Sequence, residues 1–457
     1  MSHISDSRFY GDGFCTPEMR AHFSDEARFQ RWLDVEAALA LVQGELGVIP
    51  REAAHEIAGK ARLENVDLEV VRRQIAYTSH SLVPLLREVQ GACRDGLGEF
   101  IHFGATTQDI QDTGSVLEMR GAFDLLRGDL TAILELLIDL AERHEGTLMA
   151  AKTHGQHALV TTFGYRVAIN LRELARHMTR MREASRRLFR VSLFGGVGNM
   201  TSLPRGVETM QGLAARLRLE PADVSWHTSR DCIAEFVSLM AMICSTLGKI
   251  GNEVFVLART ECGELAEGHV AGRLGSSTMP HKRNPEVSQR IVLLARLTKY
   301  QAAMALEAMI AEDDRDMRSF RADWVSIPDV CSYTAAAARL TKQMLVNLDV
   351  RADRMEQNLL LQRDFVFSEA LMFKLGEAVG KQTAHQIVYE ASMRAYDRGE
   401  PITDHLLQDP KVHAHLDRAT VEELLVTSAH VGAAAELTRS AVEQSRRELA
   451  ELASWSP

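Results

Sequence analysis

The chain has 457 residues, of which 46% are hydrophobic and 25% charged, as in a globular protein with a large core, and this length predicts about two to four domains. The net charge of −10 argues against nucleic acid or an anionic membrane as partner, because both require a basic face. The 6 cysteines form no CxxC pair or metal-ligand spacing, which argues against zinc and is typical of a reduced, cytosolic protein.

The sequence does not predict a secretory signal or a membrane helix. The N-terminal residues lack the apolar core of a secretory signal. No uninterrupted apolar run approaches the ~20 residues of a membrane helix. We therefore expect a cytoplasmic protein.

Proline positions and hydrophobic periodicity predict the long helices. An interior proline breaks a helix, so the intervals that begin after Pro84, Pro221 and Pro328 leave room for long ones. Apolar residues with a period near 3.6 occur in several such intervals. The predicted long helices cover residues 113–145, 161–190, 231–264, 286–310 and 329–348.

Five long helices with few strand signals predict an all-α fold around a helical bundle. We expect an N-terminal helical domain over 1–110, a central long-helix bundle over 111–350 and a C-terminal helical domain over 351–457. The segment 231–264 is apolar around much of its circumference. We therefore expect a homo-oligomer built through the central helices; the alternative is that these stripes form only the core of one chain.

The segment 275–285, Gly-Ser-Ser-Thr-Met-Pro-His-Lys-Arg-Asn-Pro, carries the most specific signal. Its leading glycine and two prolines predict a loop. Its hydroxyls, cations and carboxamide suit a loop that closes over an anionic substrate. The alternative is an ordinary solvated polar loop.

This string resembles the signature loop of the fumarase/aspartase superfamily, in the branch of adenylosuccinate lyase and 3-carboxy-cis,cis-muconate cycloisomerase. Residues 102–109 (His-Phe-Gly-Ala-Thr-Thr-Gln-Asp) and 152–157 (Lys-Thr-His-Gly-Gln-His) resemble the branch's other two conserved regions. The resemblance implies a three-domain L-aspartase-like fold and a homotetramer with a core of about twenty helices. It also implies composite active sites that draw on three subunits and need neither metal nor cofactor.

The superfamily reaction is a β-elimination. A base removes a proton next to a carboxylate, and a group leaves from the adjacent carbon. The intermediate places a second negative charge on the carboxylate, so fixed donors and cations must surround it. A general acid then protonates the leaving atom.

The loop implies the base and part of the carboxylate site. Ser276 lies at the position of the family's catalytic serine, with Ser277 as the second choice. Lys282 is expected to assist the serine and, with Asn284, to hold a substrate carboxylate. Met279 is expected beside the substrate.

The other two conserved regions imply further roles. Thr106 and Thr107 are expected to donate to a carboxylate at a helix start; the alternative is an N-cap, with Asp109 or Asp112 as a further capping residue. His154 matches the general acid, and its side-chain type titrates in a suitable range. His157 is expected to be a packing residue.

Three other positions extend the predicted site. His80 matches an active-site histidine of adenylosuccinate lyases; the alternative is a partly buried histidine at a helix end. Arg230 either pairs with Asp231 or reaches a substrate carboxylate. The glycine-rich run 194–199 resembles a tight turn near the active site.

Three arginines follow the predicted helix 286–310. Arg315, Arg318 and Arg321 lie where the family contacts the leaving half of the substrate, which suggests that this half is anionic. The alternative is a solvated basic helix face.

The chain also departs from the family pattern. Adenylosuccinate lyases anchor a phosphate through an Arg-Tyr pair, where this chain has Gly13 and Phe14. A glutamate usually supports the general acid at the position of Gln289. A neutral amide would not raise the pKa of a histidine as a carboxylate does. Either Glu286 substitutes, or the leaving group needs less protonation.

We therefore expect a lyase that releases fumarate from a small substituted succinate, with a nitrogen leaving group as first choice. Its substrate would be a small dicarboxylate or tricarboxylate. A carboxymuconate cycloisomerase is the second choice and adenylosuccinate lyase the third. A catalytically silent relative is the alternative from another class.

Overall fold

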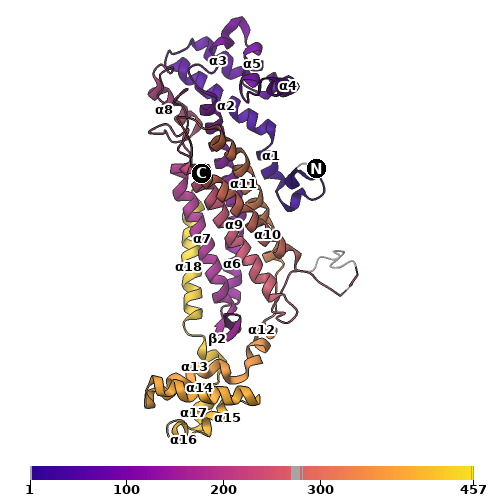
Figure 1. Cartoon of the computed structure of the whole chain (residues 1–457), viewed down its shortest axis with the longest axis vertical. Coiled ribbons are helices and arrows are strands. Elements are labelled where there is room, and N and C mark those ends of the chain that lie inside the picture. Colours follow the sequence, from indigo (N-terminus) through magenta and orange to yellow (C-terminus); the bar gives the residue numbers. More distant parts are fainter. Residues whose placement is uncertain (1–2, 269–277, 280, 454, 456–457) are drawn as a thin grey trace.

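The computed structural model describes residues 3–268, 278–279, 281–453 and 455. In this part the protein is an elongated, almost entirely helical molecule, with long central helices and smaller helical regions at both ends (Figure 1). The all-α prediction is confirmed.

The N-terminal region holds five helices: α1 (Pro17–His22), α2 (Asp25–Glu45), α3 (Arg51–Lys60), α4 (Leu68–Thr78) and α5 (Val83–Ala92). Side-chain caps fix several of their starts. Ser24 accepts from the backbone N–H of Ala27 before α2, and Asp67 accepts from the first turn of α4. Short 3-10 helices occur throughout the chain at Ile4–Asp6, Gly11–Gly13, Leu63–Asn65, Arg94–Phe100, Leu360–Phe367 and Thr427–His430.

The central bundle consists of α6 (Thr107–Arg143), α7 (Phe163–Leu188), α9 (Asp231–Leu257), α10 (Glu286–Glu307) and α11 (Met317–Val346). The shorter α8 (Gly206–Leu217) packs on α2. One continuous apolar core joins the bundle to most of the N-terminal helices. The first four predicted long helices are thus found, with boundaries shifted by up to seven residues.

The fifth predicted helix, 329–348, was wrong at its start. Helix α11 begins at Met317 and continues through Pro328. Proline removes one backbone hydrogen bond, but Ile327 before it and Val330 two residues after it are buried in the core. Burial of these side chains outweighs the local preference for a break.

Two small sheets accompany the bundle. Strands β1 (Leu148–Thr153) and β2 (Gln156–Thr162) form an antiparallel hairpin at the far end of α6, which the sequence prediction missed. Strand β3 (Leu265–Ala266) pairs with β4 (Asp349–Val350), so the segment before the signature loop is joined to the end of α11.

The C-terminal region has its own apolar core, and one helix that leaves it. Helices α12 (Ala352–Leu359), α13 (Ser368–Val379), α14 (Lys381–Arg398), α15 (Ile402–Leu407), α16 (Pro410–His413) and α17 (Arg418–Glu423) lie at one end of the molecule. Helix α18 (Ala434–Ala453) returns along α7, where Arg172 binds Glu448 at 2.7 and 2.9 Å. The expected domain 351–457 therefore includes a helix that packs with the central bundle.

Helix α9 is long and apolar enough to span a membrane, with a mean hydropathy of 1.5 over its best window. Yet 72% of that window is buried within the chain, between α7, α10 and α11. Its composition is that of a central core helix.

Helix α10 presents an apolar stripe to solvent. Leu293, Tyr300 and Met304 are 42%, 73% and 38% exposed, and their spacing places them on one face. This face is uncovered in a single chain. An oligomer would cover it, but the oligomer expected from the sequence stays a prediction.

Candidate active site

The predicted site residues occupy three separate places in one chain. Thr106 and Arg315 lie at the start of α6, whereas His154 lies in the hairpin that follows its end. Helix α6 has 37 residues and is therefore about 55 Å long. Lys282 precedes α10, whose 22 residues place it about 33 Å from the end that leads to Arg315. Ser276 and Ser277 lie outside the described residues.

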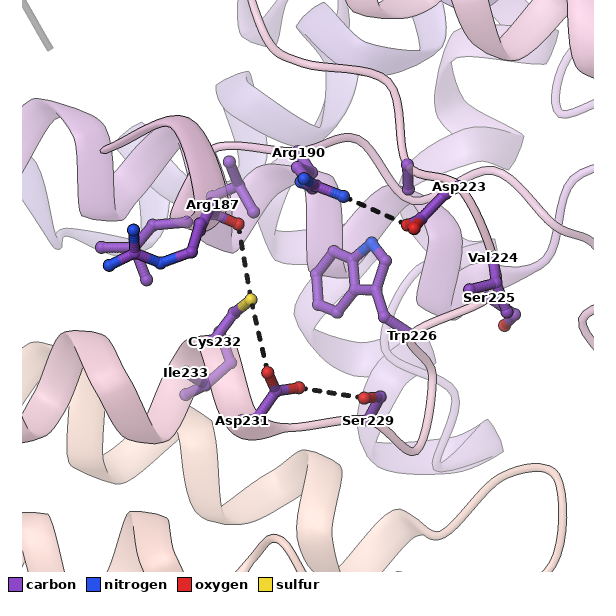
Figure 2. Close-up of a pocket in the computed structure, with 13 residues that line it drawn as sticks. Arg187, Arg190, Asp223, Val224, Ser225, Trp226, Ser229, Asp231, Cys232 and Ile233 are labelled. Carbon is purple, nitrogen blue, oxygen red and sulfur yellow. Dashed lines mark hydrogen bonds and ion pairs between the residues drawn. The ribbon is translucent and has the colours of Figure 1, made fainter. Parts of the chain in front are cut away.

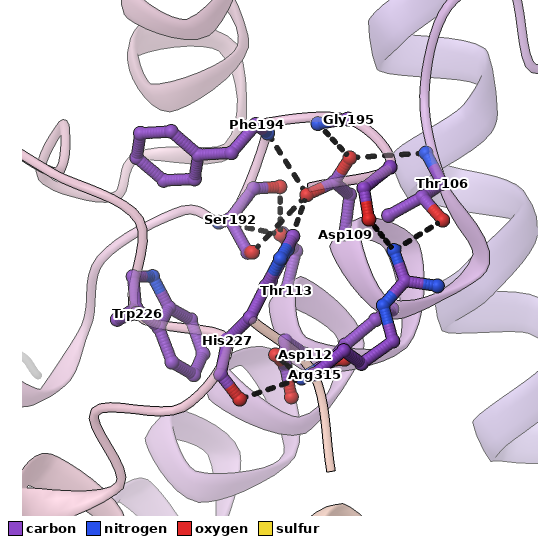
Figure 3. A network of polar contacts seen from close by, with 12 residues as sticks. Thr106, Asp109, Asp112, Thr113, Ser192, Phe194, Gly195, Trp226, His227 and Arg315 are labelled. Atoms are coloured by element: carbon purple, nitrogen blue, oxygen red, sulfur yellow. Dashed lines mark hydrogen bonds and ion pairs between the residues drawn. The ribbon is translucent and has the colours of Figure 1, made fainter. Parts of the chain in front are cut away.

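Asp109 organises the start of α6. Its fully buried carboxylate accepts from the backbone N–H groups of Thr106 at 3.0 Å, Phe194 at 2.9 Å and Gly195 at 2.9 Å. It also accepts from Nε2 of His227 at 2.8 Å (Figure 3). The glycine-rich run is thereby held against the first turn of α6. The capping role expected for Asp109 or Asp112 belongs to Asp109.

Arg315 also connects the start of α6 to the glycine-rich run. Its Nη2 donates to Oγ1 of Thr106 at 2.8 Å and to the carbonyl of Gly196 at 2.7 Å. Figure 3 shows both bonds meeting at one guanidinium nitrogen. Thr107 is the first residue of α6, next to this contact, and is partly exposed.

His80 caps helix α5. Its Nδ1 accepts from the backbone N–H groups of Leu82 at 3.3 Å and Val83 at 3.1 Å. Burial, together with the nearby His102 and Arg321, lowers the pKa of His80. The neighbouring Ser81 accepts from Gln111 on α6, so this turn is tied to the Thr106 end of the bundle.

Glu36 and His102 form a buried pair that sequence reasoning missed. Nδ1 of His102 lies 2.6 Å from Oε1 of Glu36. Burial alone would lower the pKa of His102, but the charge and hydrogen bond of Glu36 outweigh it and raise this pKa. Glu36 lies within α2, 66 positions earlier, and no local pattern marks it.

Arg230 does neither of the things expected of it. It is 1% exposed and donates to Asp112 at 2.9 and 3.0 Å and to Asp323 at 3.1 Å. Asp231 instead accepts from Ser229 at 2.9 Å. Arg230 therefore joins α6, α9 and α11, and burial leaves it no access to a substrate.

His154 occupies the tip of the hairpin. Thr153 pairs with Gln156, so His154 and Gly155 form the two-residue loop, with φ of 51° and 80°. Two positive φ values are typical of a type I′ turn. The side chain of His154 is exposed in the single chain.

The described part of the signature loop lies at the surface before α10. Met279 and Lys282 are exposed and Asn284 is partly buried. Gln289 is exposed and its amide donates to the carbonyl of Pro285 at 3.2 Å.

Glu267, which the sequence did not single out, caps helix α10. Its carboxylate accepts from the backbone N–H groups of Val287 at 3.1 Å and Ser288 at 2.7 Å. Residue 267 is thereby fixed beside residue 287. A carboxylate at a helix N-terminus is also favoured by the helix dipole.

The other two predicted arginines, Arg318 and Arg321, make contacts that do not involve Thr106. Arg318 is largely exposed and binds Asp316 and Glu312 at 2.7 and 2.9 Å. Its hydrogen bonds hold the pKa of Asp316 below its usual range. Arg321 stacks over the ring of Trp324 at 3.8 Å. In this conformation Arg318 belongs to a surface ion cluster.

Of two cavities in the structure, one contains none of the predicted site residues and the other contains only Gln289. A cavity of about 260 Å³ is lined by Arg187, Arg190, Trp226 and Cys232 and contains none of the predicted residues (Figure 2). A wider groove of about 850 Å³ is lined by Gln289 together with Gly13, Phe14, Arg290 and Arg339. In the described part of the chain, no group of three His, Cys, Asp or Glu side chains could hold a metal ion.

Comparisons with known proteins give matches over most of the chain. The family model described as Lyase matches residues 13–296, and that described as Adenylosuccinate lyase C-terminus matches 364–441. N-acetyl-S-(2-succino)cysteine lyases from Enterococcus italicus and Dickeya dadantii are each 39% identical over 95% of this chain, and the matches cover 96% and 95% of those proteins. The 3-carboxy-cis,cis-muconate lactonizing enzyme of Pseudomonas putida superposes with a TM-score of 0.88 at 31% identity, over 97% of this chain and 100% of that one.

Proposed function

Because the chain belongs to the fumarase/aspartase superfamily, in the adenylosuccinate lyase and cycloisomerase branch, we propose that it releases fumarate from a succinate with a sulfur substituent. The substrate would be an S-(2-succino) derivative of a small thiol. The observation that carries this proposal is the 39% identity, over nearly full length, to two lyases named for that substrate class.

Sulfur fits this chain better than the nitrogen leaving group expected from the sequence. A cysteine thiol has a reference pKa near 8.5, so a thiolate can leave with little help from an acid, whereas an amine nitrogen must carry an additional proton to leave as a neutral amine. Gln289 carries no charge that could raise the pKa of the general acid. Its amide is bound to Pro285 and faces solvent in the single chain.

The proposed chemistry assigns one task to each group. Ser276, with Ser277 as the second choice, takes the proton next to the carboxylate. Lys282 and Asn284 then stabilise the charge that develops there. The C–S bond breaks as the double bond forms, and the thiolate leaves.

The carboxylates and the leaving atom would be met by residues from other parts of the fold. Thr106 and Thr107 donate to the carboxylate at the start of α6. His154 protonates the leaving sulfur, and Met279 packs beside the substrate. His80 completes the pocket at the Thr106 end.

We infer that these groups meet between copies of the chain. The length of α6 separates Thr106 from His154 within one protomer. The exposed His154 and the apolar stripe of α10 support an assembly in which neighbouring chains run alongside each other in opposite directions. We propose a homotetramer with composite active sites in the cytoplasm.

The test is a direct comparison of leaving groups. Purified protein would be incubated with N-acetyl-S-(2-succino)cysteine and, separately, with an N-substituted aspartate, and fumarate would be followed by its ultraviolet absorbance. The proposal predicts fumarate from the thioether and little from the amine. Fumarate from the amine alone would contradict it.

A carboxymuconate cycloisomerase stays the second choice, because the structural likeness to the Pseudomonas putida enzyme covers the whole chain. Conversion of carboxymuconate without fumarate would favour it. Adenylosuccinate lyase stays third, because Gly13 and Phe14 stand where that enzyme has the Arg-Tyr pair that anchors its phosphate.

A further inference from the structure

Two residues bridge the same two segments at the start of α6. Asp109 holds the backbone N–H groups of Thr106 and Gly195, at 3.0 and 2.9 Å. Arg315 holds the hydroxyl of Thr106 and the carbonyl of Gly196, at 2.8 and 2.7 Å. The first turn of α6 and the glycine-rich run are thereby locked together at both backbone and side-chain level (Figure 3).

The hydroxyl of Thr106 can still donate one hydrogen bond. A threonine hydroxyl has one proton to donate and two lone pairs that accept. Its oxygen already accepts from Arg315, and no acceptor for its proton lies among the residues that the structure describes. The proton is therefore available to an incoming anion.

Part of the Arg315 guanidinium is already committed within the protein. Its Nη2 makes two hydrogen bonds and its Nε is shielded from solvent, so the N–H groups of Nη1 are its remaining donors. A charged donor makes a stronger bond than a neutral one and polarises the hydroxyl that accepts it. Arg315 is thus placed to act on a bound anion through Thr106.

We propose that Arg315 is a positioning residue that orients and strengthens the Thr106 hydroxyl as a donor to the substrate carboxylate. The inference rests on the proposed function, in which Thr106 binds that carboxylate. It replaces the expectation that Arg315 itself contacts the leaving half of the substrate. Asp109 supports the same geometry by fixing the Thr106 backbone.

A double-mutant cycle separates indirect from direct action. The variants are Arg315→Gln, Thr106→Val and the double variant, and the readouts are the KM and kcat for N-acetyl-S-(2-succino)cysteine and the calorimetric Kd for fumarate. Thr106→Val should raise KM and Kd about tenfold, the loss of one good hydrogen bond. Arg315→Gln should raise them by a similar or smaller factor.

The double variant decides the matter. If Arg315 acts through Thr106, the double variant should be no worse than Thr106→Val alone, because the interaction has already been removed. If the increases in KM and Kd of the two single variants multiply in the double variant, the proposal is overturned, because Arg315 would then contact the substrate independently of Thr106. Unchanged KM and Kd for Thr106→Val would overturn it as well.

Two control variants test whether a change in affinity reflects the lost hydrogen bond and not a loss of folding. Thr106→Ser keeps the hydroxyl and should retain most of the affinity, whereas the matched surface change Arg72→Gln should alter neither constant. All variants should share the thermal midpoint of the wild type within a few degrees. Absence of fumarate release by the wild type would contradict the proposed function, whereas a multiplicative cycle in fumarate binding would contradict the role of Arg315 alone.

Discussion

His154 illustrates what a single residue contributes to this fold. Its φ of 51° lies in the left-handed region, which costs a non-glycine residue about 1–2 kcal/mol. The type I′ turn requires that conformation, and the turn presents the imidazole at the hairpin tip. A functional side chain held in a disfavoured conformation by a tight turn is a common arrangement at active sites.

Replacement of His154 should therefore affect chemistry more than binding. We expect His154→Gln to lower kcat by about 10²-fold, the low end of the usual contribution of a general acid because a thiolate leaves with less help, with a smaller change in KM. Steady-state kinetics of fumarate release would measure both constants. His157→Gln, on the same hairpin, is the control and should retain near-normal kcat; equal losses in the two variants would contradict the assignment.

Residue roles could be predicted only where a local motif marks them. His154 and Lys282 lie in short strings from which a role can be predicted. The partners of Arg230 lie 118 positions earlier and 93 later, so no local pattern connects them. The neighbouring Asp231 was the obvious partner in sequence, but the helix start directs it to Ser229 instead.

The contact of Arg230 matters at the scale of elements, because it fastens three helices together. Arg230→Met would leave Asp112 and Asp323 buried without their cation. We expect a loss of about 3–5 kcal/mol in the free energy of unfolding, the usual result of breaking a buried ion pair. Urea unfolding followed by circular dichroism would measure it.

An exposed pair supplies the control for that measurement. Arg187 binds Glu235 at the surface, with side chains that are 55% and 38% exposed. Arg187→Ala should cost under about 1 kcal/mol, because solvent screens such pairs. Equal midpoints for the two variants would show that the buried cluster is not what fastens α6, α9 and α11.

A polar relay joins α7 to α9. Arg180 donates to Nδ1 of His177 at 3.1 Å, and Nε2 of His177 donates to Thr246 at 3.0 Å. Thr246 then donates to Glu173 at 2.6 Å, which also binds Lys249. The arginine requires an acceptor at Nδ1, so the relay holds the imidazole neutral.

This relay predicts a loss of stability in acid. Burial, followed by the charge of Arg180, lowers the pKa of His177 to about 4, from 6.5 in the unfolded chain. The unfolded chain therefore binds a proton below pH 6.5 that the folded chain refuses. The stability is fully present above pH 6.5 and falls as pH drops toward 4, by at most about 3 kcal/mol at 1.36 kcal/mol per unit.

Urea unfolding at several pH values between 7 and 4.5 would test this prediction. His177→Gln should flatten the dependence of the unfolding free energy on pH in this window. His413→Gln changes an exposed histidine and should leave the slope unaltered. An unchanged slope in His177→Gln would contradict the assignment.

Elements were more predictable than contacts. The hydrophobic period and the proline-free intervals located the long helices, because buried helices need continuous apolar faces. Pro328 misled the prediction, since packing tolerates a proline that local propensity forbids. The hairpin around Gly155 was missed, because the pair His154-Gly155 is not one of the Asn-Gly or Asp-Gly pairs that typically mark such a turn.

At the scale of the whole molecule, the predicted site residues that the structure describes lie apart within one chain. Thr106 and His154 are separated by the length of α6, and the stripe of α10 lies open to solvent. The sequence predicted an oligomer from the apolar circumference of the segment 231–264, but α9 is mostly buried within one chain and the uncovered apolar face belongs to α10. The relative placement of the three conserved regions could not be predicted, because it depends on the direction of each helix.

The stripe of α10 predicts an effect on assembly. We expect the wild type to scatter light as a particle of about four chains. Charges at the centre of the stripe, in the pair Leu293→Asp and Tyr300→Asp, should shift the mass toward smaller species, because a buried unpaired charge is costly. Leu125→Asp, a change of another exposed apolar residue, tests whether any such change has the same effect.

Mixing two inactive variants tests the composite site most directly. His154→Gln and Ser276→Ala would each be purified, combined, dissociated by mild denaturant and reassembled, and fumarate release would be compared with that of each variant treated alone. If the catalytic groups come from different chains, mixed assemblies contain some intact sites, and activity should reappear well above either parent. If the mixture stays as inactive as its components while its mass confirms reassembly, each site lies within one chain and the account is wrong.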